Sequence, residues 1–474
     1  MEFEAVIGLE LHAQINTKSK MFSSAPVSFA LTPNSSTDLL DFAFPGSLPT
    51  VNKEAVIAAI KMCHALNMEI DDTLIFERKN YFYSDLSKGY QITQQFRPIG
   101  KNGYLTIKLN NETKLIGITR LHLEEDTCKQ LHTSDVSLLD YNRSGIPLLE
   151  IVSKPDIKNG AEAVKYVEKM RSILSFLGVC DGKMEEGSLR VDINISLKHQ
   201  ESTSFGTKVE IKNLNSFSNI QKAIDYEIDR QSKLLESGNK IKQETRRYDE
   251  KQKKTVPMRI KLNSIDYKFF TDPNIPPIRL SSDFINAAIA SSSELAESNK
   301  QRYMSLGINE ISSNILTSEV NLSKYFDKCL RFGCSPILLS NWVITDVLSF
   351  LNKNNIEINE FPIKEENLAN LVLLIDEGKI SGKQAKVLFN KMIETKKDVK
   401  ILISDMGLSQ ENDINVLLGI ISKVLNNNEQ AIIDYKLGKD RAVCYLVGQV
   451  IKLTNGNANP TLANKLIVEE LKRR

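Results

Sequence analysis

The stretch that decides the fold is Val6-Ile-Gly-Leu-Glu-Leu-His-Ala-Gln-Ile15, in which apolar and polar residues alternate. This alternation predicts a β-strand, because successive side chains on a strand point to opposite faces. One face carries the apolar Leu9, Leu11 and Ala13, and the other carries the polar Glu10, His12 and Gln14. A carboxylate and an imidazole roughly 7 Å apart on one face belong either to a solvated surface or to one wall of a metal or phosphoryl site.

Three later segments alternate in the same way. Their polar faces hold Arg120, His122 and Glu124 in residues 113–126, Arg190, Asp192 and Asn194 in residues 189–197, and Lys208, Glu210 and Lys212 in residues 207–213. Glycine, proline and asparagine separate these segments, which is typical of antiparallel strands joined by turns. Glu125 and Asp126 close the first of the three.

Two segments have the spacing of amphipathic helices. Apolar residues recur every three or four positions in residues 160–177, which Gly178 ends, and in residues 216–235, where Ser216 or Ser218 suits the N-cap. We interpret both apolar stripes as core contacts. The predicted fold class is therefore α+β, with helices packed on an antiparallel sheet whose other face is polar.

Small polar residues between 281 and 299 indicate a domain junction, and beyond it the pattern becomes helical. Helices are predicted over residues 320–332, 338–351, 365–376 and 381–393, and again from about 412 to the end. Ser381 suits an N-cap, Asn459-Pro460 suits a cap before a first-turn proline, and Trp342 is expected in a core. The predicted domains are 1–290, 291–404 and 405–474.

Bulk composition describes an ordinary soluble protein, with 474 residues, 41% hydrophobic and 25% charged residues and a formal net charge of +2. Because this net charge is nearly zero, any RNA contact must come from local patches. The six cysteines form no Cys-x-x-Cys pair, and the N-terminus has neither a signal-peptide pattern nor an apolar run of about 20 residues. We therefore expect a cytoplasmic protein with no membrane partner.

The common catalytic motifs are absent from the sequence: no phosphate loop, no dinucleotide-binding glycine turn, no serine nucleophile elbow and no zinc-protease helix. The polar-faced strands and nearby residues instead offer oxygen ligands and an imidazole: Glu10, His12, Glu125, Glu150, Asp192, Asn194 and Glu210. Basic residues accompany them: Arg78, Lys79, Lys88, Arg120, Arg143, Lys208 and Lys212. This combination favours a magnesium or manganese site that binds a nucleotide triphosphate.

Residues 78–94 interleave tyrosines, including Tyr81, with lysines. Such a segment can stack bases and bind phosphates, or it can form a packed loop. From Lys436 onward, eight basic residues stand against three acidic ones, which leaves a net charge of +5. This tail is either a solvated surface or a contact for a phosphate backbone.

Long motifs in chain order carry a resemblance to a known family. They include Val6-Ile-Gly-Leu-Glu-Leu-His12, Arg78-Lys-Asn-Tyr-Phe-Tyr83, Ile118-Thr-Arg-Leu-His-Leu-Glu-Glu-Asp126, Asp140-Tyr-Asn-Arg-Ser-Gly-Ile-Pro-Leu-Leu-Glu150, Met184-Glu-Glu-Gly-Ser-Leu-Arg190, Glu210-Ile-Lys-Asn-Leu-Asn-Ser216, Gln243-Glu-Thr-Arg-Arg247 and Leu446-Val-Gly-Gln-Val450. With them the chain resembles the B subunits of the tRNA-dependent glutamyl/aspartyl amidotransferases, the GatCAB family.

The resemblance implies a fold and an activity. The fold would be an N-terminal cradle similar to the glutamine synthetase catalytic fold, followed by a helical domain and a YqeY-like helical tail. The cradle would bind ATP, Mg²⁺ and the acceptor end of Glu-tRNA(Gln) or Asp-tRNA(Asn), and would phosphorylate the side-chain carboxylate. Ammonia released by the family's amidase (A) subunit, with a small (C) subunit bridging the two, would then form the amide.

The resemblance also implies roles for single residues. Metal ligands would be His12, Glu125 and Glu150, with Glu10, Asp192, Asn194 and Glu210 as further catalytic groups. Nucleotide or substrate contacts would be Lys79, Tyr81, Lys88, Arg143, Lys208 and Lys212. The tail would contact tRNA through Lys436, Lys439, Arg441 and Lys452. One loop departs from the family pattern, since Thr271, Asp272 and Asn274 replace Pro, Glu and Asp, which puts a charged role for that loop in doubt.

Two rival interpretations stay open at this point. One is a stand-alone ATP-dependent amide ligase that acts on a small acid with free ammonia. The other is a non-catalytic RNA-binding scaffold whose carboxylate strands form only a solvated face.

Overall fold

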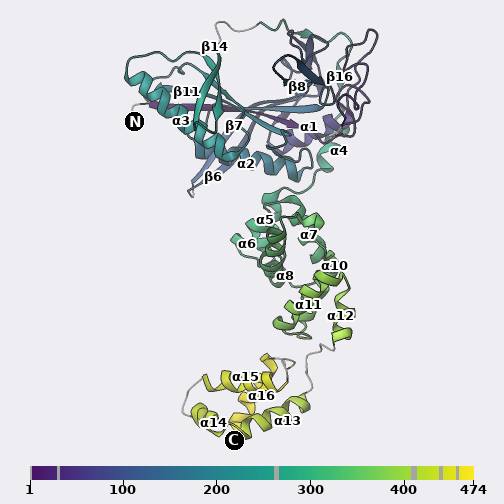
Figure 1. The fold of residues 1–474 in the computed structure, drawn as a ribbon, viewed down its shortest axis with the longest axis vertical. Coiled ribbons are helices and arrows are strands. Elements are labelled where there is room, and N and C mark those ends of the chain that lie inside the picture. Colours follow the sequence, from purple (N-terminus) through teal and green to yellow (C-terminus); the bar gives the residue numbers. More distant parts are fainter. Residues whose placement is uncertain are drawn as a thin grey trace. The chain divides into compact units, whose positions relative to one another are not determined.

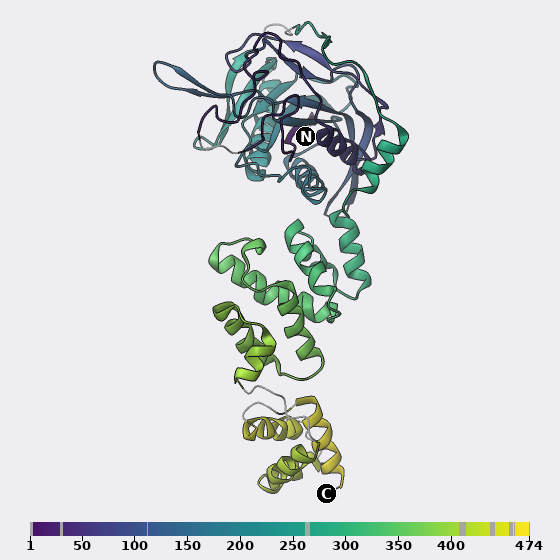
Figure 2. The same ribbon diagram turned by 90° about the vertical axis from the view of Figure 1, so that its right-hand side faces the viewer.

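The computed structural model describes residues 3–28, 32–110, 112–260, 266–406, 414–436, 441–454, 458 and 460–473. It separates into two compact units, one up to Leu295 and the other from Ala296 onward (Figures 1 and 2). The predicted junction within residues 281–299 contains this division. The further boundary at residue 404 stays a prediction.

The N-terminal unit is built on one nine-stranded sheet with the strand order β14-β13-β12-β11-β1-β10-β7-β6-β2. The strands are β1 (Phe3–Gln14), β2 (Glu69–Ile70), β6 (Gly100–Leu109), β7 (Glu112–Glu125), β10 (Pro147–Ser153), β11 (Leu189–His199), β12 (Val209–Lys212), β13 (Glu244–Asp249) and β14 (Lys254–Ile260). The strand that opens the chain, β1, thus lies at the centre of the sheet, between β10 and β11.

The two faces of β1 differ as the alternation predicts. Ile7, Leu9 and Leu11 are buried, whereas Glu10 and His12 are partly exposed. The apolar face shares one core cluster with residues of α1 (Lys53–Ala65), α2 (Gly160–Phe176) and α3 (Phe217–Glu236), and α4 (Ser282–Ala290) packs on α1. The prediction of an α+β fold with an apolar and a polar sheet face is confirmed.

The predicted helix boundaries are also confirmed. Helix α2 ends at Phe176, and Gly178 follows with a φ of +69°, a left-handed conformation that favours glycine. Helix α3 starts after Ser216, whose side chain accepts a hydrogen bond from the backbone N–H of Asn219. Gly178 and Ser216 therefore mark helix ends through the local conformation and hydrogen bonding of the backbone.

One strand pair corrects the expectation of a purely antiparallel sheet. Strands β12 and β13 are parallel, whereas the other pairs among the described strands of the sheet are antiparallel. The reason lies in the connection. A parallel pair needs a crossover longer than a hairpin, and α3 supplies it between these two strands.

Three small sheets border the large one. They are formed by β15 (Phe270–Thr271), β4 (Glu77–Asn80) and β5 (Tyr90–Thr93), by β16 (Ile278–Arg279) and β3 (Thr73–Leu74), and by β8 (Lys129–His132) and β9 (Ser137–Asp140). The loop that departs from the family pattern follows β15. Its Asp272 is buried and forms an ion pair with Arg78 at 2.7 Å, so one carboxylate of this loop does have a charged partner.

In the described part of the C-terminal unit, all regular secondary structure is helical. The helices are α5 (Ala296–Ser305), α6 (Glu310–Leu316), α7 (Val320–Leu330), α8 (Pro336–Trp342), η1 (Val343–Val347), α9 (Leu348–Asn354), η2 (Ile358–Glu360), α10 (Glu365–Asp376), α11 (Gly382–Thr395), α12 (Val399–Met406), α13 (Ile414–Asn426), α14 (Glu429–Lys436), α15 (Arg441–Leu453) and α16 (Pro460–Arg473). One core cluster holds buried residues from 303 to 402, and another holds buried residues from 417 to 471.

Local predictions for this unit are confirmed where the structure describes them. Trp342 is buried against Phe389, with ring centroids 5.6 Å apart. Ser381 caps α11 in a capping box with Gln384. The helix predicted over 338–351 is interrupted by the π-helical turn η1. Asn459, the other predicted cap, lies outside the described residues. Within the described parts, no helix is long and apolar enough to cross a bilayer.

Candidate active site

The register of the central strands gathers polar side chains into one row. His12 on β1 faces Glu150 on β10 and Arg190 on β11, and Glu150 in turn faces His122 on β7. Directly paired residues in an antiparallel sheet have Cβ atoms about 5 Å apart on the same face. Residues separated by more than a hundred positions therefore meet on the polar face that the alternation of β1 predicts.

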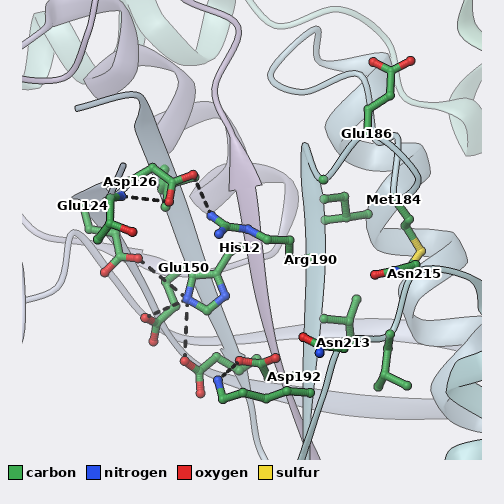
Figure 3. Close-up of a pocket in the computed structure, with 18 of the residues that line it drawn as sticks. His12, Glu124, Asp126, Glu150, Met184, Glu186, Arg190, Asp192, Asn213 and Asn215 are labelled. Atoms are coloured by element: carbon green, nitrogen blue, oxygen red, sulfur yellow. Dashed lines mark hydrogen bonds and ion pairs between the residues drawn. The ribbon is translucent and has the colours of Figure 1, made fainter. Parts of the chain in front are cut away.

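At the centre of this row His12 lies among three carboxylates. Its Nε2 atom is 3.4 Å from Glu150, 3.7 Å from Glu10 and 3.7 Å from Glu124. His122 contributes a second imidazole, whose Nε2 lies 3.4 Å from Glu150 and 3.6 Å from Glu124. Figure 3 shows one nitrogen of the His12 ring facing Glu124 and Glu150, with dashed lines marking its ion pairs. We call these five residues the carboxylate–imidazole cluster.

Their pKa values follow from burial and from one another. Burial lowers the pKa of His122, but Glu150 and Glu124 outweigh it and raise that pKa to about 9. Burial raises the pKa of Glu150, yet the two imidazoles hold it well below its ordinary value. Burial and the neighbouring Glu150 raise the pKa of Glu10. The three carboxylates are thus balanced in part by the two imidazoles, and Arg120 lies 3.5 Å from Glu150 at the edge of the cluster.

Two subsets of the cluster are spaced for a metal ion. The candidate ligand atoms of Glu10, His12 and Glu150 lie within 4.8 Å of one another, and so do those of His122, Glu124 and Glu150. Carboxylate oxygens with an imidazole suit Mg²⁺ or Mn²⁺. The buried Nδ1 atom of His122 has no hydrogen-bond partner among the described residues. The residues therefore fit a divalent cation, with Glu150 shared between the two subsets.

A second charged group lies along β11 and β12. Lys212 forms ion pairs with Asp192 at 2.5 Å and with Glu210 at 3.2 Å. These two carboxylates raise the pKa of Lys212 despite its burial, so the lysine stays charged. Thr245 on β13 donates a hydrogen bond to Glu210. Asp192 faces Glu10 across β1 and β11, so this group adjoins the cluster.

A pocket of about 540 Å³ opens over this row of side chains. Its floor comes from the cluster and the neighbouring strands, and its rim from residues 184–187 and 213–215 (Figure 3). Charged lining residues are Glu10, His12, Lys79, Glu124, Asp126, Glu150, Glu185, Glu186, Arg190, Asp192 and Lys212. A pocket of this size and polarity suits a charged substrate rather than an apolar one.

Several predicted site residues lie beside the pocket rather than in its lining. Glu125 follows Glu124 on β7 and forms an ion pair with Lys88 at 2.5 Å, so the structure does not bring it into the cluster. Arg143 donates hydrogen bonds to the carbonyl oxygens of Thr127 and Cys128. Lys208 is exposed.

The remaining predictions fall in three places. Asn194 faces Glu210 across β11 and β12, and both lie outside the pocket lining. Lys79 lines the pocket, and its Nζ atom stands 5.8 Å from the ring centroid of Tyr81. In the tail, Lys436, Arg441 and Lys452 are exposed on α14 and α15, and Lys439 lies outside the described residues.

Sequence reasoning left several lining or cluster residues unassigned, among them His122, Glu124, Asp126 and Arg190. The signal for the first two was present. Strand alternation puts Glu124 on the face of His122 and sends Glu125 to the opposite face. For Asp126 and Arg190 the decisive information is the pairing of distant strands, which a single sequence does not contain.

The fold and the pocket together define a class: an α+β protein with a charged pocket on the polar face of its sheet, whose carboxylates and imidazoles are spaced for a metal ion. Comparison with known proteins agrees with this class. The model described as the GatB/GatE catalytic domain matches residues 5–286, and the model described as the GatB domain matches residues 324–471.

Curated relatives match along their whole length. The B subunit of the aspartyl/glutamyl-tRNA(Asn/Gln) amidotransferase of Bacillus cereus (strain AH187) is 47% identical over 475 residues, covering 100% of both chains. The protein of the same name from Bacillus thuringiensis (strain Al Hakam) is 46% identical over 475 residues, again with 100% of both chains covered. The chain belongs to this GatB family.

Proposed function

We propose that this chain is the synthetase component of a tRNA-dependent amidotransferase. It acts on Glu-tRNA(Gln), Asp-tRNA(Asn) or both, and converts the side-chain carboxylate to an amide. The observation that carries the proposal is the carboxylate–imidazole cluster at the floor of a charged pocket, in a chain 47% identical over its full length to the B subunit of such an enzyme.

The chemistry explains why the pocket needs groups of both signs. A carboxylate is a poor acyl donor, so one of its oxygens first attacks the γ-phosphorus of ATP. An O–P bond forms, the bond to the β-phosphate oxygen breaks, and ADP leaves. Ammonia then attacks the carbonyl carbon, the C–O bond to phosphate breaks, and one proton passes to a base or to water. Lys79 and Lys212 would offset the charge of the bound anions.

A divalent cation would be held by Glu10, His12 and Glu150, with Glu124 and His122 beside them. We place Glu124 in the ligand role predicted for Glu125, because Glu125 is paired with Lys88. When bound, Mg²⁺ would supply charge neutralisation for the polyphosphate. The protein's own part is to fix this set of ligands, and the buried His122 holds Glu124 and Glu150 in place.

The ammonia would come from glutamine through partner chains. This assignment is supported by the sequence, which carries no serine or cysteine nucleophile motif for a glutaminase. The partners would be the amidase (A) and the small bridging (C) chains of the same complex. The complex would work in the cytoplasm, where its tRNA substrate is charged. The buried free cysteines Cys63, Cys128, Cys180, Cys329 and Cys334 suit that compartment.

The test is ATP turnover by the complex with defined acceptors. Mischarged Glu-tRNA(Gln) or Asp-tRNA(Asn) should stimulate ADP release, and glutamine should yield amidated tRNA. Stimulation by a free small acid instead of mischarged tRNA would favour a stand-alone amide ligase. Tight tRNA binding with no ADP release would favour a non-catalytic scaffold.

His12→Ala and Glu150→Ala should abolish phosphorylation and leave tRNA binding largely intact, because these side chains lie in the cluster and we assign RNA binding to the tail. Filter binding and ADP release, measured on the same preparations, separate the two effects. Unchanged amidation in either variant would contradict the assignment.

The tail contact is tested by charge removal. The double variant Arg441→Gln/Lys452→Gln should weaken tRNA binding several-fold and reduce its salt dependence, because each phosphate contact releases about one counterion. The double variant Lys222→Gln/Lys240→Gln, at two exposed sites of the N-terminal unit, serves as the charge-matched control. A truncation after residue 438 that binds tRNA as tightly as the full chain would refute the tail assignment.

A further inference from the structure

Arg190 is a charged group in the pocket that the proposal above leaves without a role. It lies on β11 directly across from His12 and lines the pocket. Its Nη2 atom donates to Asp126 at 3.0 Å, whereas its buried Nε atom has no hydrogen-bond partner among the described residues. Figure 3 shows the guanidinium beside the His12 ring, reaching toward Asp126. A planar group with five donors thus has donor capacity left beside the cluster.

Asp126 holds this guanidinium from one side. The carboxylate is buried, and its Oδ2 atom also accepts a hydrogen bond from Gln14 at 3.2 Å. Arg143 approaches the same oxygen at 3.7 Å. Two guanidiniums therefore share one carboxylate, and the group keeps a positive charge. Because Gln14 lies on β1 and Arg190 on β11, Asp126 fixes the arginine relative to both strands.

The other cations of the pocket are less available. Lys212 is already paired with two carboxylates, Asp192 and Glu210. Lys79 stands 5.0 Å from the ring centroid of Tyr267, at the side formed by β4. Among the described lining residues, Arg190 lies directly opposite His12 and shares its carboxylate partner, Asp126, with Arg143. Its planar guanidinium can also donate two parallel hydrogen bonds, which matches two oxygens of a phosphoryl group.

We infer that Arg190 is a catalytic residue that binds the phosphoryl group while it is transferred, and that Asp126 is the residue that positions it. The inference rests on the proposed function. In the first step the guanidinium contacts non-bridging oxygens as the carboxylate oxygen bonds to phosphorus and ADP departs. In the second it contacts the same oxygens as nitrogen bonds to carbon and inorganic phosphate leaves. Arg190 takes no proton in either step, because a guanidinium stays protonated.

The experiment measures ADP release by the assembled complex with saturating mischarged tRNA. Arg190→Ala should lower kcat about 100-fold or more, since removal of one preorganised donor to developing charge costs about 10²–10³. The KM for the mischarged tRNA should change less than about threefold, because we assign most tRNA contacts to other residues. Guanidinium at tens of millimolar should restore at least about a tenth of the lost rate, which a purely structural loss would not show.

Two further variants protect the test against misfolding. Arg190→Lys keeps the positive charge but loses the planar guanidinium donors, and should lower kcat at least about 10-fold without loss of folded protein. Asp126→Asn should lower kcat without rescue by guanidinium. Arg97→Lys is the control, because Arg97 makes a similar pair with Asp71 and lies outside the pocket lining.

The outcomes separate the two claims. If the kcat for ADP release of Arg190→Ala or Arg190→Lys lies within threefold of that of the unaltered complex, the role of Arg190 is wrong. The role is also wrong if the loss of kcat matches the fraction of unfolded protein. If the unaltered complex releases no ADP in response to mischarged tRNA, the proposed function itself fails.

Discussion

Two clusters of buried or half-buried charges in the N-terminal unit invite comparison. One is the carboxylate–imidazole cluster of the pocket. The other joins α3 to β13 and β14, and consists of Glu227, Arg230, Glu244 and Arg246 with Thr255. Both draw charged residues from separate segments of the chain. They differ in the groups that balance their carboxylates.

The second cluster is closed. Glu227 is completely buried and lies 2.8 Å from Arg230 and 3.0 Å from Arg246. Arg246 also pairs with Glu244 at 2.6 Å, and Thr255 donates a hydrogen bond to Glu227. Burial raises the pKa of Glu227, but Arg230 and the hydrogen bonds outweigh it and lower that pKa. Two carboxylates meet two guanidiniums, and the cluster is neutral without any ligand.

The pocket cluster is open. It places three carboxylates around two imidazoles, with Arg120 3.5 Å from Glu150, and burial and Glu150 raise the pKa of Glu10 above its ordinary value. The difference teaches how to tell a charged site that serves binding from one that serves stability. A buried set balanced by guanidiniums, which stay protonated, locks secondary structure elements together, whereas a set balanced in part by imidazoles can exchange their protons for a metal ion.

The largest effect is expected from Glu10→Gln, which should lower ADP release about 100-fold or more. It should not lower the free energy of unfolding. A carboxyl whose pKa is raised in the folded state is less stable as a carboxylate there than in the unfolded chain, so removal of its charge is neutral or stabilising at pH 7. Kinetics and urea denaturation check the two halves. A destabilised but active variant would erase the distinction between the clusters.

Glu227→Gln should do the opposite. It leaves a buried guanidinium without its full partner, which costs about 3 kcal/mol in the free energy of unfolding. Activity per folded molecule should stay the same, because Glu227 lies outside the pocket lining. Asp229→Asn is the matched control on the same helix, since its ion pair with Lys233 is exposed and its loss should leave the denaturation midpoint in place.

Acid should remove the stabilisation that the ionised Glu227 contributes to the closed cluster. The pKa of Glu227 is lowered below its ordinary value of 4.5, so its charge stabilises the fold above that value, and the stabilisation is lost as the pH falls through the lowered pKa. The difference in unfolding free energy between the unaltered chain and Glu227→Gln should be constant from pH 7 to about pH 5 and shrink below it. Urea titrations across this range measure it; a constant difference at pH 3 would contradict the assignment.

The smallest effect is the stabilisation of the open cluster by metal. Mg²⁺ at about ten times its dissociation constant should contribute about 1.4 kcal/mol, a shift of a few degrees in Tm. Glu150→Gln should not respond, because Glu150 belongs to both candidate ligand subsets. Glu227→Gln should respond as the unaltered chain does. Equal shifts in all three proteins would mean that the ion binds elsewhere.

Much of the fold could be predicted from the sequence. Alternation and helical spacing are local properties, and they placed β1, α2, α3 and the cap at Ser381 correctly. The strand order and the parallel β12–β13 pair could not be predicted. They depend on which distant strands pair, and this is decided by packing of the whole core rather than by any single segment.

The candidate site shows the same limit at the level of single residues. Glu10, His12 and Glu150 were predicted and do meet. Glu124 and Glu125 are chemically alike and adjacent, so only the phase of the strand distinguishes the one in the cluster from the one paired with Lys88. Alternation placed Arg190 on a polar strand face, but its role could not be predicted, because that role comes from its position opposite His12.

The central position of β1 has a consequence for synthesis of the chain. Strand β1 leaves the ribosome before its two hydrogen-bonded neighbours, β10 and β11, which begin at Pro147 and Leu189. At about 5–20 residues per second, β1 waits roughly ten seconds for either neighbour. During that time it is an apolar strand with two open edges, which is the form most prone to pair with another nascent chain. Early shielding of residues 3–14 should therefore govern how much of the protein folds at all.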